Sequence, residues 1–263
     1  MELYDNVRDY NNTDKKNKNF ILALLTNTTL NELEIYKYKI SYVLIEIFAK
    51  NVKTNTKLTS IYLYSCYIGN EGVLLLINAL KNNNVLIELS LSNNYINDYG
   101  IEKMLESLKT IKALEFLNLS YNKINDKGAI LLSEFLETNN KLRYFYIDFN
   151  KISDEGATAL ANALQTNTTL ITFKIGGNKI GSQGAIALAN ALQTNTSLKE
   201  IDIQDNNLEI NVIDVIDAFI KTLKINITLN EIKIGAITDK DRVIDKEMIN
   251  NNKIIEINIY HYL

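Results

Sequence analysis

The repeating unit of this chain is clearest at residues 142–169, which read LRYFYIDFNKISDEGATALANALQTNTT. In the first half, Phe145 and Ile147 are two residues apart, a period that predicts a short strand with these side chains pointing inward. In the second half, Leu160 and Leu164 are four residues apart, which places both on one face of a helix. The apolar period therefore changes from a strand pattern to a helix pattern within one unit.

The same unit recurs at a constant interval of 28 residues. It begins at Leu30, Leu58, Leu86, Leu114, Leu142, Leu170 and Leu198. A single strand and helix cannot bury their apolar sides alone, so successive units must stack and share one core. We therefore expect an α/β solenoid, with a parallel sheet on the concave face and helices on the convex face.

One position between strand and helix holds a short side chain in six of the seven units. Its members are Cys66, Asn94, Asn122, Asn150, Asn178 and Asn206. A turn at this point leaves backbone amides and carbonyls without partners unless a short polar side chain reaches them. The row predicts a ladder of asparagines, and it gives Cys66 a structural role instead of a catalytic one.

Two further rows lie where each helix begins. The first row, Asn70, Asp98, Asp126, Asp154 and Ser182, predicts side-chain caps for the helix that follows each residue. The second row consists of Gly72, Gly100, Gly128, Gly156 and Gly184. Glycine lowers helix propensity, so its presence predicts a close approach of strand and helix at this position.

The pattern Leu-x-x-Leu-x-Leu-x-x-Asn-x-Ile, then Gly-Ala and Ala-Leu-Ala-Asn-Ala-Leu, resembles the ribonuclease-inhibitor-like leucine-rich repeat. The resemblance covers about residues 16 to 263 and implies a right-handed horseshoe. The same repeat builds ribonuclease inhibitor, the repeat regions of NOD-like receptors and Ran GTPase-activating protein. It is therefore specific for fold and leaves the partner open.

Breaks in the repeat divide the chain into three segments. Residues 1–29 are expected to be an N-terminal segment with a capping helix, 30–228 seven leucine-rich repeats, and 229–263 irregular last repeats with a C-terminal cap. The repeat that follows the one at Leu198 begins at Leu229, later than the 28-residue interval predicts, which indicates an insertion in the preceding helix. The last unit is expected to end the sheet as an edge strand near Ile254.

Stacked strands place equivalent outward residues in columns, which predict a binding surface on the concave face. We expect an aromatic patch on the middle repeats, a second aromatic group nearer the N-terminus and an acidic area toward the C-terminus. The predicted partner-binding residues are Phe116, Tyr121, Tyr144, Tyr146 and Phe149, then Tyr62 and Tyr64, then Asp148, Glu200 and Asp202. Exposed aromatic side chains with polar neighbours are typical of protein interfaces. The alternative is that a tyrosine-rich chain places some rings outward by chance.

Composition excludes several classes of partner and favours a soluble cytoplasmic protein. The formal charge is −3, with 28 basic and 31 acidic residues, so the basic footprint of a nucleic-acid-binding protein is missing. No window of about 18 apolar residues predicts a membrane span, and one cysteine fits a reducing compartment.

The absence of proline and tryptophan suggests an AT-rich genome. An effector acting in a host's cytoplasm, from an intracellular bacterium or a large virus, is compatible with this composition. Asn27, Asn167 and Asn195 begin possible glycosylation sequons, which we interpret as turn residues.

The sequence offers little for catalysis, and we expect no enzyme activity, no cofactor and no metal. The single histidine, His261, lies at the C-terminus, and Gly176 and Gly177 belong to a repeat turn instead of a phosphate loop. A Ran-type GTPase-activating protein is one alternative, although none of the strand-to-helix loops contains an arginine. A structural solenoid that self-associates through its end strands is another. We expect a monomer, with an edge-strand dimer as the alternative.

Overall fold

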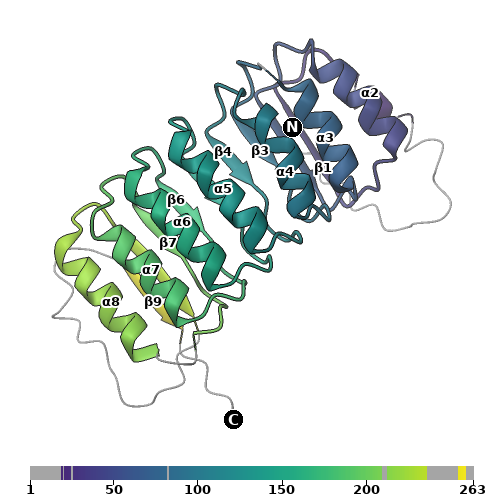
Figure 1. Cartoon of the computed structure of the whole chain (residues 1–263). Helices are drawn as coiled ribbons and strands as arrows, with labels where there is room; N and C mark the ends of the chain where they lie inside the picture. Colours follow the sequence, from purple (N-terminus) through teal and green to yellow (C-terminus); the bar gives the residue numbers. More distant parts are fainter. Residues whose placement is uncertain are drawn as a thin grey trace.

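The computed structural model describes residues 19, 21–24, 26–81, 83–208, 212–235 and 254–258, and in them strands alternate with helices (Figure 1). The strands are β1 Glu32–Tyr36, β2 Ser60–Tyr64, β3 Glu88–Ser90, β4 Phe116–Asn118, β5 Tyr144–Tyr146, β6 Thr172–Lys174, β7 Glu200–Asp202, β8 Glu231–Gly235 and β9 Ile254–Asn258. The helices are α2 Tyr42–Val52, α3 Gly69–Ala79, α4 Asp98–Leu108, α5 Asp126–Thr138, α6 Asp154–Thr166, α7 Ser182–Leu192 and α8 Val212–Ile225. This alternation confirms the predicted leucine-rich-repeat solenoid.

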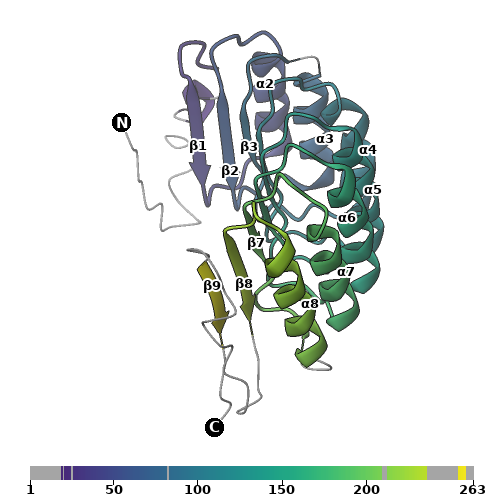
Figure 2. The same cartoon turned by 90° about the vertical axis from the view of Figure 1, so that its left-hand side faces the viewer.

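The strands form one parallel sheet in chain order, from β1 to β9. The register follows the repeat, because Glu88 pairs with Phe116, and Phe116 with Tyr144. After β7 the step lengthens as predicted, since Glu200 pairs with Glu231. Figure 2 shows the helices stacked along one side of the sheet, on the outer side of the curve, and no helix of the described residues covers the other face. β1 and β9 are the two ends of this sheet.

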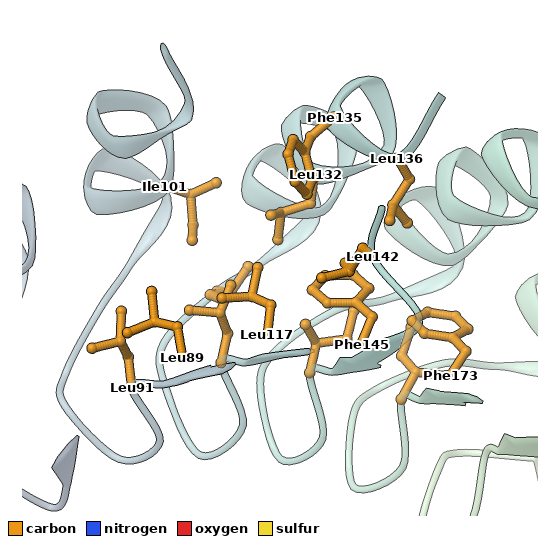
Figure 3. Packing of buried hydrophobic residues seen from close by; sticks show 14 of the residues in the cluster. Leu89, Leu91, Ile101, Leu117, Leu132, Phe135, Leu136, Leu142, Phe145 and Phe173 are labelled. Carbon is orange, nitrogen blue, oxygen red and sulfur yellow. The ribbon is translucent and has the colours of Figure 1, made fainter. Parts of the chain in front are cut away.

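The core lies between the sheet and the helices and runs through all the stacked repeats. Phe145 of β5 and Phe173 of β6 are fully buried and stack with their ring centroids 5.8 Å apart. Leu132 and Leu136 of α5 cover this layer, as Figure 3 shows. At the N-terminal end, Ile21 is buried in the same cluster. The three-segment division of the chain remains a prediction.

The predicted asparagine ladder is confirmed bond by bond. The Nδ2 of Asn150 donates to the carbonyls of Leu119 at 3.0 Å, Ile147 at 3.0 Å and Asp148 at 3.2 Å. Its Oδ1 accepts a hydrogen bond from the Ile124 amide at 3.0 Å. Since Leu119 and Ile124 belong to the preceding repeat, each asparagine joins two turns of the solenoid.

Cys66 occupies the first position of this ladder and is fully buried. Its Sγ donates to the carbonyls of Ile35 at 3.4 Å and Tyr64 at 3.5 Å. Burial raises the pKa of the thiol to about 12, so the reactive thiolate does not form near neutral pH. These contacts agree with the predicted structural role.

The capping prediction was wrong about which helix is capped. Asp98, Asp126 and Asp154 are the first residues of their helices, and their carboxylates cap the helix of the next repeat. The Oδ1 of Asp126, for example, accepts hydrogen bonds from the amides of Ser153 at 2.8 Å and Gly156 at 2.9 Å. An aspartate on α5 therefore satisfies the N-terminus of α6, which ties neighbouring helices together.

The same contacts correct the explanation of the glycine row. A Cβ on Gly128 would lie 2.5 Å from Oδ1 of Asp98, and one on Gly156 would lie 2.7 Å from Oδ1 of Asp126. The close neighbour is thus the capping carboxylate of the preceding repeat, and not the strand. Gly128, Gly156 and Gly184 leave room for that carboxylate to reach the helix amides, and at Gly100 the close neighbour is the amide oxygen of Asn70.

A second asparagine row, between each helix and the next strand, was only partly anticipated. The Oδ1 of Asn167 accepts from the amides of Thr169 at 3.1 Å and Leu170 at 2.9 Å, which confirms its interpretation as a turn residue. Its Nδ2 reaches back to the Leu136 carbonyl at 2.8 Å. Asn27, Asn55, Asn83, Asn139, Asn195 and Asn226 accept from amides in the same way.

Replacing Asn150 by Leu should lower the free energy of unfolding by at least about 3 kcal/mol. The change leaves several buried amides and carbonyls unpaired, each of which costs about 1 to 3 kcal/mol. Denaturant unfolding followed by circular dichroism measures the loss. Asn162→Leu on the exposed side of α6 is the matched control and should be close to neutral. Equal stability of the two variants would contradict the ladder.

Candidate partner-binding surface

The open face of the sheet carries three of the predicted aromatic residues on adjacent strands. Phe116 on β4 pairs with Tyr144 on β5, and the ring of Phe116 meets the ring of Tyr146 edge to face with centroids 5.1 Å apart. Tyr144 is exposed, whereas Phe116 and Tyr146 are half-buried. The structure therefore gathers these side chains into one cluster, as the column pattern predicted.

Tyr121 and Phe149 extend this cluster beyond the ends of β4 and β5. Their rings stack nearly parallel, with centroids 4.3 Å apart and an interplanar angle of 11°. Both remain open to solvent, at 52% and 41% relative exposure. We call Phe116, Tyr121, Tyr144, Tyr146 and Phe149 the middle aromatic patch.

The backbone at Tyr121 and Phe149 is left-handed, with φ of 58° and 51°. The same conformation recurs at the equivalent turn position of other repeats, at Lys37, Ser65, Asn93, Gly177 and Asp205. Left-handed backbone is unfavourable for a bulky residue, and Gly, Asn or Asp fit it better. Two repeats therefore place an aromatic ring where the fold alone favours a small or polar residue.

The N-terminal aromatic group forms a separate cluster. Tyr62 and Tyr64 stack with centroids 5.9 Å apart, and Tyr36 meets Tyr64 at 6.3 Å. The hydroxyl of Tyr62 donates to the Glu88 carboxylate on the next strand. These contacts tie the rings to one another and to the sheet.

The predicted acidic residues do not form a purely acidic surface. Glu200 lies 3.6 Å from the ammonium of Lys174 and 3.9 Å from that of Lys233. Lys233 also pairs with Glu231 at 3.0 Å. Much of the acidic charge of β7 and β8 is therefore balanced by lysines of the same columns.

Asp148 and Asp202 differ from these residues because they line a hollow beside the middle aromatic patch. The Asp148 carboxylate accepts hydrogen bonds from the Gly176 amide at 3.0 Å and the Ser120 hydroxyl at 3.1 Å. Burial and the nearby Asp202 carboxylate raise the pKa of Asp148 to about 6. Burial also raises the pKa of Asp202. Both carboxylates are thus costly to ionise in the folded protein.

The hollow has a volume of about 310 Å³ and opens on the concave face at the ends of β4 to β7. It is lined by Ser92, Asn118, Ser120, Tyr121, Tyr146, Asp148, Phe149, Lys174, Gly176, Gly177, Asp202, Gln204 and Asp205. Gly176 and Gly177 stand in two outward columns that hold side chains in the neighbouring repeats. The missing side chain of Gly176 helps to open the hollow, and the space over Gly177 is occupied by the Phe149 ring. Both glycines were predicted only as turn residues and the hollow was not predicted, although the gap at Gly176 in the outward column is visible in the sequence.

Other functional classes find little support in the described part of the chain. Among those residues, no group of three or more His, Cys, Asp and Glu side chains is arranged to hold a metal ion. No helix there combines the length and the apolar character needed to cross a bilayer.

Replacing Phe149 by Asn should change the free energy of unfolding by no more than about 1 kcal/mol. The loss of ring stacking, about 0.5 to 1.5 kcal/mol, is offset by a residue that adopts left-handed backbone more readily. Phe145→Ala is the comparison, because that buried ring should cost about 3 to 5 kcal/mol. A comparable loss in both variants, measured by denaturant unfolding, would show that Phe149 is a structural residue.

Replacing Asp148 by Asn should stabilise the protein at pH 7 by about 1 to 3 kcal/mol, since one pKa unit corresponds to about 1.4 kcal/mol. The folded pKa is raised, so the wild type loses stability as the pH rises from about 4 to about 6, and the gain should vanish near pH 4. The neighbouring charges are Asp202, Glu200, Lys174 and Lys233, which remain in the variant.

Thermal unfolding at pH 4, 5.5 and 7 checks this pH dependence. Asp205→Asn, which changes an exposed carboxylate of the same hollow, is the control and should have little effect. A destabilised Asp148→Asn protein at pH 7 would mean that the ionised carboxylate holds the turn together.

Comparison with known proteins agrees with the architecture. The family model described as Leucine Rich repeat matches residues 54–76, 113–133, 138–161, 166–189 and 194–209. A solved structure of leiomodin-1 actin-binding site 2 is 20% identical with a TM-score of 0.48, covering 56% of this chain and 87% of that chain. The tropomodulin C-terminal domain from Caenorhabditis elegans is 21% identical with a TM-score of 0.48, covering 59% of this chain and 91% of that chain. A comparison with curated proteins found no match. The matched segments and the stacked strand-helix units show that this chain is built from leucine-rich repeats.

Proposed function

We propose that this chain is a non-enzymatic scaffold that binds a protein partner on the concave face of its sheet. The observation that carries the proposal is the stacked pair Tyr121 and Phe149, two exposed rings held on left-handed backbone. Strained positions of this kind are concentrated at functional sites, where the strain serves a purpose other than folding. A smaller residue would satisfy the turn, so the rings are best explained by what they contact outside the chain.

The rest of the middle aromatic patch supports the same use. Phe116, Tyr144 and Tyr146 lie beside the stacked pair on β4 and β5, so the rings offer one continuous aromatic area. Tyrosine and phenylalanine bury a large area while losing few rotatable bonds, which makes them frequent interface hot spots. The sheet below them is rigid, so a partner would bind a preformed surface.

We also propose a repeat subtype, an oligomeric state and a cellular compartment for this chain. The Asn ladder with Gly-Ala and Ala-Leu-Ala-Asn-Ala-Leu helices supports the ribonuclease-inhibitor-like subtype. The single buried cysteine fits a protein that works as a monomer in a reducing cytoplasm. Action as an effector in a host's cytoplasm is consistent with this composition.

Affinity capture from eukaryotic cytosol tests the proposal. Wild-type protein should retain a partner that is lost, by about tenfold or more, with the triple variant Phe116→Ala, Tyr144→Ala, Tyr146→Ala, because each hot-spot truncation costs about 2 kcal/mol or more. Phe149→Asn should weaken capture as well. Quantitative mass spectrometry of the eluates measures the loss, after circular dichroism has shown that each variant folds.

The control removes exposed tyrosines from the helical side of the solenoid. Tyr42→Ala on α2 and Tyr99→Ala on α4 delete rings that are 59% and 48% exposed, and capture should be unaffected. If the patch variants still captured the partner and this control did not, the interface would lie on the convex face. Failure of the wild type to retain any protein would also count against the proposal.

A further inference from the structure

The floor of the hollow is a point where three oxygen atoms converge on Gly176. A Cβ at Gly176 would lie 3.0 Å from the carbonyl oxygen of Gln204 and 3.5 Å from one carboxylate oxygen each of Asp148 and Asp202. Because Gly176 has no side chain, this position is open to the hollow. The Gln204 carbonyl already accepts from the Gly177 amide at 2.8 Å and from the Nδ2 of Asn206 at 3.3 Å. The two carboxylates each accept one backbone amide here and keep further lone pairs for an incoming donor.

The wall of the hollow is aromatic on the side of the middle aromatic patch. The ring of Phe149 lies over Gly177, since a Cβ there would come within 2.4 Å of its Cδ1. Tyr121 stacks on the other face of this ring, and Tyr146 lines the hollow as well. A long aliphatic stem could therefore pack against rings while its end reaches the oxygen atoms.

The charges of the hollow are unbalanced. Three carboxylates line it, from Asp148, Asp202 and Asp205, against one ammonium, from Lys174. That ammonium is shared, because it lies 3.6 Å from Glu200 and 4.7 Å from the ring centre of Tyr146, and with Lys233 it partly offsets the rise in the pKa of Asp202. Burial without a matching cation also explains why the pKa of Asp148 is raised. The hollow therefore fits a cation supplied by another molecule.

We propose that the hollow over Gly176 and Gly177 is a specificity pocket for an arginine side chain of the partner. The guanidinium would donate to the carboxylates of Asp148 and Asp202, and the stem would pack along the exposed edge of the Phe149 ring. Arginine fits better than lysine, because its planar group donates in several directions at once. This inference rests on the proposed concave-face function and adds the chemistry of the partner.

The side chain of Gln204 offers a further contact for such a segment. Its Nε2 is buried at the edge of the hollow and has no hydrogen-bond partner among the described residues. Because this atom is covered, the Gln204 side chain would have to rotate before its amide could donate to a backbone carbonyl of the arginine-containing segment. The pocket would then recognise both the side chain and the extended backbone beside it.

Selection from a phage-displayed library of random linear peptides tests this inference on the whole protein. The best binders should share an arginine, and replacing it by citrulline, its uncharged isostere, should weaken binding by about tenfold or more in isothermal titration. Gly176→Ala fills the convergence point with a methyl group and should weaken the same peptides equally. Asp202→Asn keeps the acceptor for the Gln204 amide at 3.0 Å but removes the charge, so it tests the pocket without adding bulk.

Glu137→Gln on α5 removes one exposed negative charge far from the sheet face and should leave binding unchanged. Peptides that lack a basic residue but no longer bind the Phe149→Asn variant would contradict the arginine pocket. They would still agree with the proposed concave-face function. Binders that respond to neither Phe149→Asn nor Gly176→Ala, or a library without binders, would count against both. Binders that tolerate citrulline would also overturn the arginine assignment.

Discussion

Hydrogen bonding between neighbouring repeats is the constraint on which this structure depends. A 28-residue unit has two turns and a helix N-terminus whose backbone groups it cannot satisfy alone. The repeats supply partners across their boundaries: Asn150 bonds to the Leu119 carbonyl of the preceding unit, and Asn167 bonds to the Leu136 carbonyl. Asp126 caps the helix of the following unit. Stability is therefore a property of adjacent pairs of repeats, as in other solenoids.

This constraint also explains the residues that look weak as helix or strand formers. A glycine in the first helical turn lowers helix propensity, yet Gly156 is needed because the carboxylate of Asp126 occupies the space of its Cβ. Cys66 stands at the N-terminal end of the asparagine ladder, where it still donates to the Ile35 carbonyl. The polar turns and the apolar core thus repeat with the same spacing for different physical reasons.

The proposed binding surface is largely independent of this framework. Backbone hydrogen bonds pair the strands, and the inward side chains pack in the core. The side chains of the outward columns are needed for neither. Two consequences matter for recognition. The rings of Tyr121 and Phe149 stack on left-handed backbone, and the Gly176–Gly177 pair removes two side chains beside them. The result is an aromatic wall next to a carboxylate-lined hollow.

The sequence by itself determined the fold, the strand register and the aromatic columns, because a strict 28-residue period fixes which side chains stack on which. It also determined the asparagine ladder, whose members can be identified from spacing alone. Only the tertiary structure decided that Asp126 caps the next helix and that Lys174 balances Glu200. It alone showed that Asp148 and Asp202 converge over Gly176. These features depend on side-chain directions and on contacts between repeats, which a one-dimensional period does not contain.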